Sequence, residues 1–393
     1  MIRIAFFVQW MICGGVENAL VALTKELYER GFDVTIYVAK NEGEFIDKVP
    51  DGVHLKEIPM EPSTRKKLMI GGFKVNYRKI LNEKKFIDLI KLTNRKIKNK
   101  RNFLELDFNQ DDIPILNETY DIAVNFHMHS PFLVWYISER VKARKKFTWI
   151  HNDFENTGYN IRGLLQYLKC IDWYFGVSQK VVEEFKTKCP EFNNKIIVAE
   201  NIVPKDDILQ KADLFFPIEY TGINKNRKII LTVGRLEEQK GIDIIINVCS
   251  QLKLLGEKFQ WFIIGEGSQR RFLENRIKKA KIEDCFHLLG VRSNPYPYFK
   301  NCDIYVQPSR HEGWGITITE ARILCKPIIT TDFAGAREQL RNGEDGFIVD
   351  CDENKILDKV KILLNDDYIA DNFKEKLSNI AFEQDLTWLK FFN

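Results

Sequence analysis

Short apolar runs alternate with longer amphipathic segments along most of this chain, and this alternation constrains the fold more than any other feature. Several of the apolar runs have no polar face, as strands covered by helices on both sides require. Strands that alternate with helices predict βαβ units and a parallel sheet. In the first 200 residues the expected strands are Ile2–Val8, Asp33–Val38, Asp121–Phe126, Lys146–Ile150, Trp173–Val177 and Lys195–Ala199, and the expected helices include Val16–Arg30, Phe132–Val141, Ile161–Lys169 and Gln179–Lys186.

Residues 201–226 interrupt this alternation, because they contain two prolines and a polar run. A second series of alternating strands and helices follows them. We therefore expect an α/β fold of two Rossmann-like, doubly wound domains facing across a cleft. The first domain is placed at 1–203, a linker at 204–226, the second domain at 227–366, and one or two terminal helices at 367–393. The expected strands of the second domain are Lys228–Val233, Phe259–Ile264, Cys285–Leu289, Ile304–Gln307, Pro327–Thr331 and Gly346–Val349, and its helices include Ile242–Leu254, Gln269–Ala280, Ile316–Leu324 and Ile356–Leu364.

The composition excludes several classes of protein. Hydrophobic residues make up 45% and charged residues 29% of the 393 residues, which is ordinary globular usage and argues against a disordered chain. No uncharged apolar run reaches the roughly 18–20 residues that a membrane-spanning helix needs. A net charge of +4 gives no reason to expect nucleic acid as a partner. The eight cysteines form no CxxC pair and no compact cluster with histidine, so we expect free thiols in a cytoplasmic protein.

Residues 65–101 depart from the pattern because they are strongly basic. They hold 14 Lys and Arg residues and two acidic residues, a local net charge of +12, and the apolar residues Phe86, Leu89, Ile90 and Ile97 recur near helical spacing. A basic amphipathic helix is typical of a surface that binds anionic lipid. A solvated helix face has the same composition, and both interpretations stay open.

The first candidate site residues follow predicted strands of the first domain, where ligands of such sheets bind. Gly14 and Gly15 lie between the first strand and the first helix, so the N–H groups that open this helix can hold a phosphate. His127 and His129 follow the strand that ends at residue 126, and His151 follows the strand that ends at residue 150. Each histidine alone could be structural. Together they predict a polar pocket that binds hydroxyls or handles protons.

The second domain carries paired cations and paired carboxylates. Arg235 and Lys240 follow its first strand and precede a helix, an arrangement suited to a diphosphate and to the charge that develops when a diphosphate leaves. Glu312 and Glu320, with seven residues between them, come from a loop and from the helix that follows. Carboxylates accept hydrogen bonds from the neighbouring hydroxyls of sugars and riboses. The glycines between them, Gly313 and Gly315, expose N–H groups at the start of that helix.

The order Gly14-Gly15, His151, Gly234-Arg235 with Lys240-Gly241, and Glu312 with Glu320 resembles the family 4 glycosyltransferases of the GT-B fold, over nearly the whole chain. The resemblance implies retaining transfer of a sugar from a UDP- or GDP-sugar, with no metal ion or other cofactor. It implies an acceptor hydroxyl on a glycan or lipid-linked glycan, in bacterial cell-surface polysaccharide synthesis. It also implies terminal helices that return to the first domain. The basic segment 65–101 is not a feature of the family and leaves the acceptor open.

The resemblance also implies a role for each motif residue. Glu320 would bind the ribose, Glu312 the hydroxyls of the donor sugar, and Arg235 with Lys240 the diphosphate. His151 would touch the sugar near the reacting centre, with His127 and His129 on the acceptor side. The remaining donor-binding residues would act mainly through their main chains: Gly14, Gly15, Gly290, Val291, Gly313, Trp314, Gly315 and Ile316.

Two other functions fit parts of this sequence. A non-hydrolysing nucleotide-sugar epimerase has the same architecture and would convert the donor without an acceptor. A non-catalytic protein that binds a nucleotide-sugar or a glycan would not need His151, Arg235, Lys240 and both glutamates together. The acidic pair Asp350 and Asp352 follows the last predicted strand, far from these glutamates, and we expect no metal site there.

Overall fold

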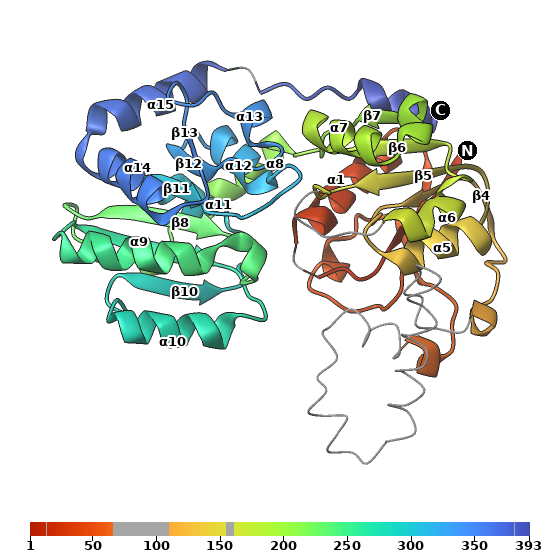
Figure 1. Cartoon of the computed structure of the whole chain (residues 1–393), viewed down its shortest axis with the longest axis horizontal. Coiled ribbons are helices and arrows are strands. Elements are labelled where there is room, and N and C mark those ends of the chain that lie inside the picture. The colour runs from red at the N-terminus through yellow and green to blue at the C-terminus, as the bar shows by residue number, and fades with distance from the viewer. Residues whose placement is uncertain (13, 66–109, 155–160, 381) are drawn as a thin grey trace, which may run out of the picture.

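A computed structural model describes residues 1–12, 14–65, 110–154, 161–380 and 382–393. The described chain forms two lobes, each built around a parallel β-sheet (Figure 1). The predicted fold class is confirmed. Strand order in both sheets runs outward on either side of the first strand, as in doubly wound domains.

The first sheet has seven strands in the order β3-β2-β1-β4-β5-β6-β7, and every pair is parallel. Its central strands are buried on both faces because helices cover them. The strands are β1 (Arg3–Val8), β2 (Asp33–Val38), β3 (His54–Glu57), β4 (Thr119–Asn125), β5 (Lys142–Ile150), β6 (Trp173–Gly176) and β7 (Ile196–Val198). The helices are α1 (Gly15–Glu29), α5 (Pro131–Glu139), α6 (Leu165–Leu168) and α7 (Gln179–Lys188).

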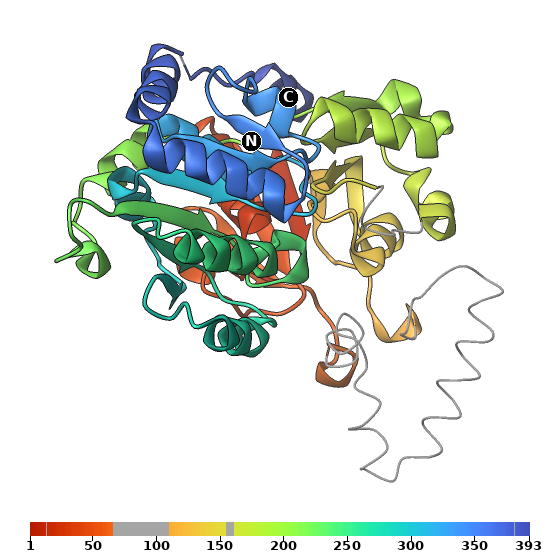
Figure 2. The same cartoon turned by 60° about the vertical axis from the view of Figure 1, so that its left-hand side comes forward.

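The second sheet has six parallel strands in the order β10-β9-β8-β11-β12-β13. Figure 2 shows α9 and α14 side by side on one face of it. The strands are β8 (Lys228–Val233), β9 (Phe259–Ile264), β10 (Phe286–Gly290), β11 (Ile304–Gln307), β12 (Ile328–Thr331) and β13 (Phe347–Val349). The helices are α8 (Lys205–Ala212), α9 (Ile242–Leu254), α10 (Arg270–Ala280), α11 (Tyr296–Asn301), α12 (Ile316–Ile323), α13 (Ala336–Gln339), α14 (Glu353–Asn365) and α15 (Asp367–Asn379).

The last residues of the chain lie on the first lobe, so both termini are found there (Figure 1). Helix α15 stays with the second lobe, where Phe373 packs in the hydrophobic core. The turn Thr387–Phe392 packs against the first sheet instead, with the ring of Trp388 5.3 Å from that of Trp149. The return therefore occurs after the end of α15 at Asn379 and before Thr387.

The basic segment lies outside the described residues except for its first member, Arg65. The Arg65 guanidinium donates to the main-chain oxygens of Ala39 and Ile58 and forms an ion pair with Glu57. All three partners belong to the first domain, so this side chain has a structural role there. No helix in the described part of the chain is both long and apolar enough to cross a bilayer.

Candidate active site

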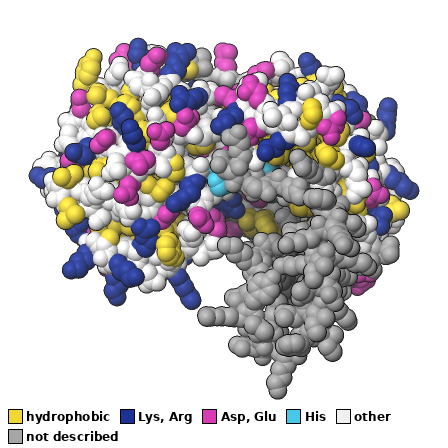
Figure 3. Space-filling model, in the orientation of Figure 1, with side chains coloured by type: hydrophobic (Ala, Val, Ile, Leu, Met, Phe, Trp, Pro, Cys, Tyr) yellow, Lys and Arg dark blue, Asp and Glu magenta, His cyan; other side chains and the backbone are white. Residues whose placement is uncertain are grey.

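Loops that follow the strands of both sheets meet at the interface between the two lobes. Gly313, in the loop after β11, lies so close to the first domain that a Cβ atom on it would be 2.0 Å from the main-chain oxygen of His151. Glu338 on α13 also reaches across, and its carboxylate accepts the N–H groups of Gln179 and Lys180 at 2.8 and 3.3 Å. Histidine and charged side chains gather where the lobes meet (Figure 3). Residues predicted from the two domains therefore share one interface.

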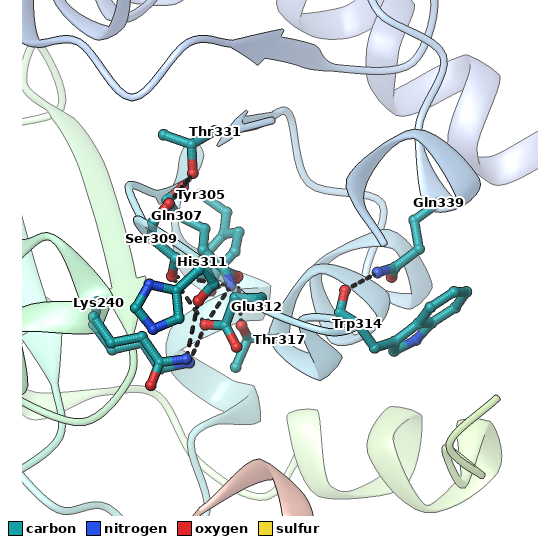
Figure 4. Close-up of polar contacts among 11 residues, drawn as sticks. Lys240, Tyr305, Gln307, Ser309, His311, Glu312, Trp314, Thr317, Thr331 and Gln339 are labelled. Atoms are coloured by element: carbon teal, nitrogen blue, oxygen red, sulfur yellow. Dashed lines mark hydrogen bonds and ion pairs between the residues drawn. The ribbon is translucent and has the colours of Figure 1, made fainter. Parts of the chain in front are cut away.

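Lys240 and Glu312 form an ion pair between Nζ and Oε1 (Figure 4). The two side chains are only 18% and 11% exposed. The same Oε1 atom accepts hydrogen bonds from Ser309 Oγ at 2.9 Å and from Gln307 Nε2 at 3.3 Å. The carboxylate predicted to bind sugar hydroxyls thus lies beside a cation predicted to bind diphosphate.

The amide of Gln307 orients this pair, and sequence reasoning missed it. Its Oε1 atom accepts hydrogen bonds from Thr317 Oγ1 at 2.6 Å and from the Tyr305 hydroxyl at 3.1 Å. These two bonds hold the oxygen, so the NH2 group faces Glu312 (Figure 4). The signal in the sequence was a polar residue at the end of an otherwise apolar strand.

The N-terminus of α12 lies at the same interface. Gly315 has φ +81°, which favours glycine, and a Cβ there would be 2.6 Å from the Phe333 ring. The helix begins at Ile316 and has no side-chain cap. A Cβ on Gly15 of the first domain would be 3.7 Å from the Ile316 Cδ1 atom. The uncapped first-turn N–H groups of α12 therefore lie opposite the start of α1.

The Trp314 indole belongs to the interior of the second domain. It is 6% exposed, and its Nε1 atom donates to Thr319 Oγ1 at 3.2 Å. Its main-chain oxygen accepts a hydrogen bond from the Gln339 amide (Figure 4). The role of Trp314 in this structure is to fix the loop before α12.

Glu320 lies inside α12 and is almost fully buried. The Tyr296 hydroxyl of α11 donates to its Oε1 atom at 3.2 Å. Burial raises the pKa of Glu320 to about 7, and Tyr296 and the charge of Lys48 oppose that rise. Lys48 comes from the first domain, where its Nζ atom donates to the Ser293 main-chain oxygen of the second domain at 3.3 Å. Tyr296 and Lys48 were not predicted.

The three predicted histidines lie together at the edge of the first sheet. The rings of His127 and His151 have centroids 6.3 Å apart. Burial lowers the pKa of His127 to about 4, with a further contribution from the charge of Arg235, and burial likewise lowers the pKa of His129 to about 4. The pKa of His151 is also well below its usual value because of burial. All three imidazoles are therefore neutral at pH 7. His151 Nε2 is buried with no hydrogen-bond partner among the described residues.

Arg235 is exposed in the loop after β8, and its charge acts on Glu17 and His127 of the first domain. Glu17 lies in the first turn of α1 and is 5% exposed. A Cβ atom on Gly14 would lie 2.4 Å from the Glu17 Oε2 atom. Sequence reasoning assigned Gly14 to a phosphate and gave Glu17 no role. The signal available was an acidic residue two positions after the glycine pair.

Gly290 and Val291 lie at the end of β10. Gly290 has φ +76°, and its main-chain oxygen accepts the N–H of Gly265 at 2.9 Å. A Cβ on Gly265 would be 1.9 Å from the main-chain oxygen of Gly234, so this turn packs directly beside the loop that carries Arg235. The Val291 oxygen accepts a hydrogen bond from the Arg292 side chain at 3.2 Å.

One member of the acidic pair after β13 has a structural role in this fold. Asp352 caps α14, and its Oδ1 atom accepts the N–H groups of Asn354 and Lys355 at 2.9 and 3.1 Å. Within the described ranges, no three His, Cys, Asp or Glu side chains are grouped as metal ligands.

Comparison with known proteins agrees with this geometry. Residues 218–383 match the family described as glycosyl transferases group 1. The matched residues lie in the second lobe and make up less than half of the chain. Its resemblance to the family 4 glycosyltransferases, inferred from the motifs, is confirmed. An uncharacterized glycosyltransferase of Methanocaldococcus jannaschii is 27% identical over 65% of this chain and 58% of its own length. A poly(ribitol-phosphate) alpha-N-acetylglucosaminyltransferase of Staphylococcus aureus is 24% identical over 62% of this chain and 49% of its own length. The chain thus matches about half the length of these relatives.

Solved structures of glycosyltransferases share the fold. A variant of S. aureus TarM, solved with fondaparinux, alpha-GlcNAc-glycerol and UDP, has a TM-score of 0.70 at 16% identity over the whole of both chains. Anabaena HepE, solved with UDP-glucose, has a TM-score of 0.69 at 16% identity over 96% of this chain and 93% of that one. WaaG, a glycosyltransferase involved in lipopolysaccharide biosynthesis, has a TM-score of 0.61 at 16% identity over 98% of this chain and 96% of that one. This chain therefore has the GT-B fold.

Proposed function

We propose that this protein transfers a sugar, with retention of configuration, from a nucleoside-diphosphate-sugar to a hydroxyl group of a glycan or lipid-linked glycan. The observation that carries the proposal is the Lys240–Glu312 ion pair beside the uncapped N-terminus of α12, under the main chain of His151. A cation and a helix N-terminus attract phosphate, and a carboxylate accepts sugar hydroxyls. These groups are brought together at the interface of the two lobes.

In the proposed reaction the leaving phosphate helps to remove the proton of the acceptor hydroxyl. Arg235 and Lys240 offset the negative charge that grows on the diphosphate as the bond to the sugar breaks. Glu312 accepts hydrogen bonds from the transferred sugar, and Glu320 from the ribose. The unpartnered Nε2 atom of His151 supports a contact with a sugar hydroxyl, because a buried polar atom without a partner costs free energy until a ligand supplies one.

The acceptor and the pathway rest on the family resemblance and on relatives. Several relatives are named for surface polymers, among them the poly(ribitol-phosphate) enzyme and a capsular polysaccharide biosynthesis glycosyltransferase, both of S. aureus. We propose an acceptor of this kind, a cytoplasmic location with peripheral attachment to the cytoplasmic membrane face through residues 65–101, and a reaction that needs no metal ion. Vesicles with and without anionic lipid, mixed with the protein at low salt, test the attachment. Equal binding to both would remove it.

A panel of nucleotide-sugars tests the proposed activity. A donor at 100 times its Kd stabilises the fold by about 2.7 kcal/mol, which a thermal melt detects. Glu312→Gln and Glu320→Gln should lose this stabilisation, whereas the control Glu344→Gln, an exposed carboxylate that pairs with Arg341, should keep it. No stabilisation by any UDP- or GDP-sugar would contradict the proposal.

A second measurement separates transfer from the alternatives. The donor that stabilises the protein is incubated alone and then with candidate acceptors. Transfer requires a product that forms only with the acceptor. Epimerised donor in the absence of acceptor would indicate an epimerase, and donor binding without any turnover would indicate a binding protein.

A further inference from the structure

Glu17 occupies an unusual place for a carboxylate. It is the third residue of α1, its side chain turns back over Gly14, and it is 5% exposed. No side chain caps this helix at the N-cap position, and Glu17 accepts a hydrogen bond from its own main-chain N–H group. The carboxylate therefore fills the position at the start of α1 where an anion is most favoured.

Groups of the second domain surround this position with positive potential. The N-terminus of α12 lies opposite that of α1, as the 3.7 Å separation between a Cβ on Gly15 and the Ile316 Cδ1 atom shows. The Arg235 guanidinium acts on Glu17 from the loop after β8. Two helix N-termini and a guanidinium that meet at one place repel one another unless an anion lies between them. Glu17 is the anion present in this structure.

We propose that the Glu17 carboxylate is an internal counter-ion that holds the place of the donor diphosphate, so that the donor binds only when this carboxylate is displaced or takes up a proton. This inference rests on the proposed function, because it assigns the diphosphate of the donor to the same position. It makes Glu17 a positioning residue: it keeps the two lobes together in the absence of donor, and it competes with the donor for Arg235.

The ionisation of Glu17 supports the proposal. Burial raises its pKa to about 7, although its own N–H group and the charge of Arg235 oppose the rise. A diphosphate brought beside the carboxylate raises this pKa further, because like charges disfavour ionisation. Donor binding should therefore take up a proton near neutral pH and should weaken as pH rises above 7.

The other ionisable groups around this position do not produce the same dependence. Arg235 stays charged throughout, and His127 and His151 stay neutral because burial lowers their pKa values. Glu320 titrates in the same range, but it accepts hydrogen bonds from the ribose as a carboxylate and so favours binding at higher pH. The two glutamates therefore give slopes of opposite sign.

Calorimetry with UDP-glucose and GDP-mannose at pH 6, 7 and 8 tests the proposal, since neither probe titrates in this range. For whichever binds, the ratio of the wild-type Kd to the Glu17→Gln Kd should rise by up to about tenfold between pH 7 and 8, which is the limit for one proton taken up. Titrations in two buffers of different ionisation enthalpy should show that uptake directly. Glu17→Gln should bind at pH 8 at least as tightly as the wild type does at pH 6. Glu26→Gln, on the same helix but near its end, should keep the wild-type slope.

The outcomes separate this inference from the proposed function. Binding by Glu17→Gln that is weaker than wild type with an unchanged pH slope would overturn the inference and leave the donor site intact. Equal proton uptake by the wild type and by Glu17→Gln would also overturn it, because the opposing contribution of Glu320 is common to both proteins. Binding of neither nucleotide-sugar at any pH would overturn the proposed donor, and the inference with it.

Discussion

Replacing Lys240 by alanine separates the stabilising role of this residue from its proposed chemical role. The sequence alone predicts a loss of kcat with stability unchanged. The ion pair with Glu312 changes that expectation, because the variant leaves a carboxylate that is 11% exposed without its cation. Breaking a buried ion pair from one side costs about 3–5 kcal/mol. Ser309 and Gln307 still donate to Glu312, so we expect a cost at or below the lower end of this range, about 2–3 kcal/mol.

Thermal melts and initial rates measure the two effects separately. At about 2–4 °C per kcal/mol for a domain of this size, the melting temperature of Lys240→Ala should fall by roughly 5–10 °C. Loss of a group that stabilises charge on the diphosphate should lower kcat by about 10²–10³-fold. The double variant K240M/E312Q removes both charges and should recover most of the melting temperature while kcat stays low.

Two results would contradict these expectations for Lys240→Ala. A wild-type melting temperature for Lys240→Ala would show that the ion pair does not stabilise the second domain. A wild-type kcat, measured at saturating donor below the melting temperature, would remove Lys240 from the proposed clamp. Recovery of kcat in the double variant would show that Lys240 acts only by neutralising Glu312.

Three further predictions follow from contacts and charges in the structure. Gly313→Ala places a Cβ 2.0 Å from the His151 oxygen, so we expect the lobes to move apart. The donor Kd should rise at least tenfold, and small-angle scattering should show a larger radius of gyration. The control Gly15→Ala makes only an ordinary van der Waals contact and should keep the wild-type radius. Trp388→Ala removes a buried ring from the first domain and should cost about 3–5 kcal/mol in chemical denaturation, and a loss below 1 kcal/mol would show that the chain end does not stabilise that domain. Burial raises the pKa of Glu320 to about 7 in the folded protein, so the folded state binds this proton more tightly than the unfolded chain does. The contribution of Glu320 to stability, measured as the difference between wild type and Glu320→Gln, should fall by about 3 kcal/mol as pH rises from 4.5 to 7. A Glu320→Gln variant with the wild-type pH profile would contradict this cause.

Local pattern was sufficient to predict most elements of the fold. The expected ranges of β2, β8, β9, β11 and α9 match the structure, because each is an apolar or amphipathic run bounded by polar residues or glycine. Strand β3 was missed because His54–Glu57 lies at the edge of the sheet and is mostly exposed, so it lacks an apolar pattern. Helix α11 was missed because Pro295 and Pro297 at its start obscure the helical pattern. The linker expected at 204–226 contains α8, which packs against α11 and α12.

The candidate site could be predicted in part for a simple physical reason. Parallel strands present all their carboxyl ends at one edge, so polar residues that follow strands, such as His151 and Arg235, are expected near a ligand without knowledge of the fold in detail. Glu17, Tyr296 and Lys48 could not be assigned in this way. Glu17 interacts with Arg235, and Tyr296 and Lys48 both interact with Glu320. These interactions form only when segments that are distant in the sequence pack together.

The periodicity and spacing of the residues predict the positions of strands and helices, the two parallel sheets and the motifs at their edges. They can do so because local structure depends mainly on residues that are close in the sequence. Ion pairing and the pKa values of buried groups depend on distance and burial. The packing of the tertiary structure determines both. Lys240 and Glu312 are 72 residues apart and form one ion pair. Glu17 lies in the first domain and Arg235 in the second, so the charge that opposes the rise in the pKa of this buried carboxylate acts on it only when the two lobes pack together.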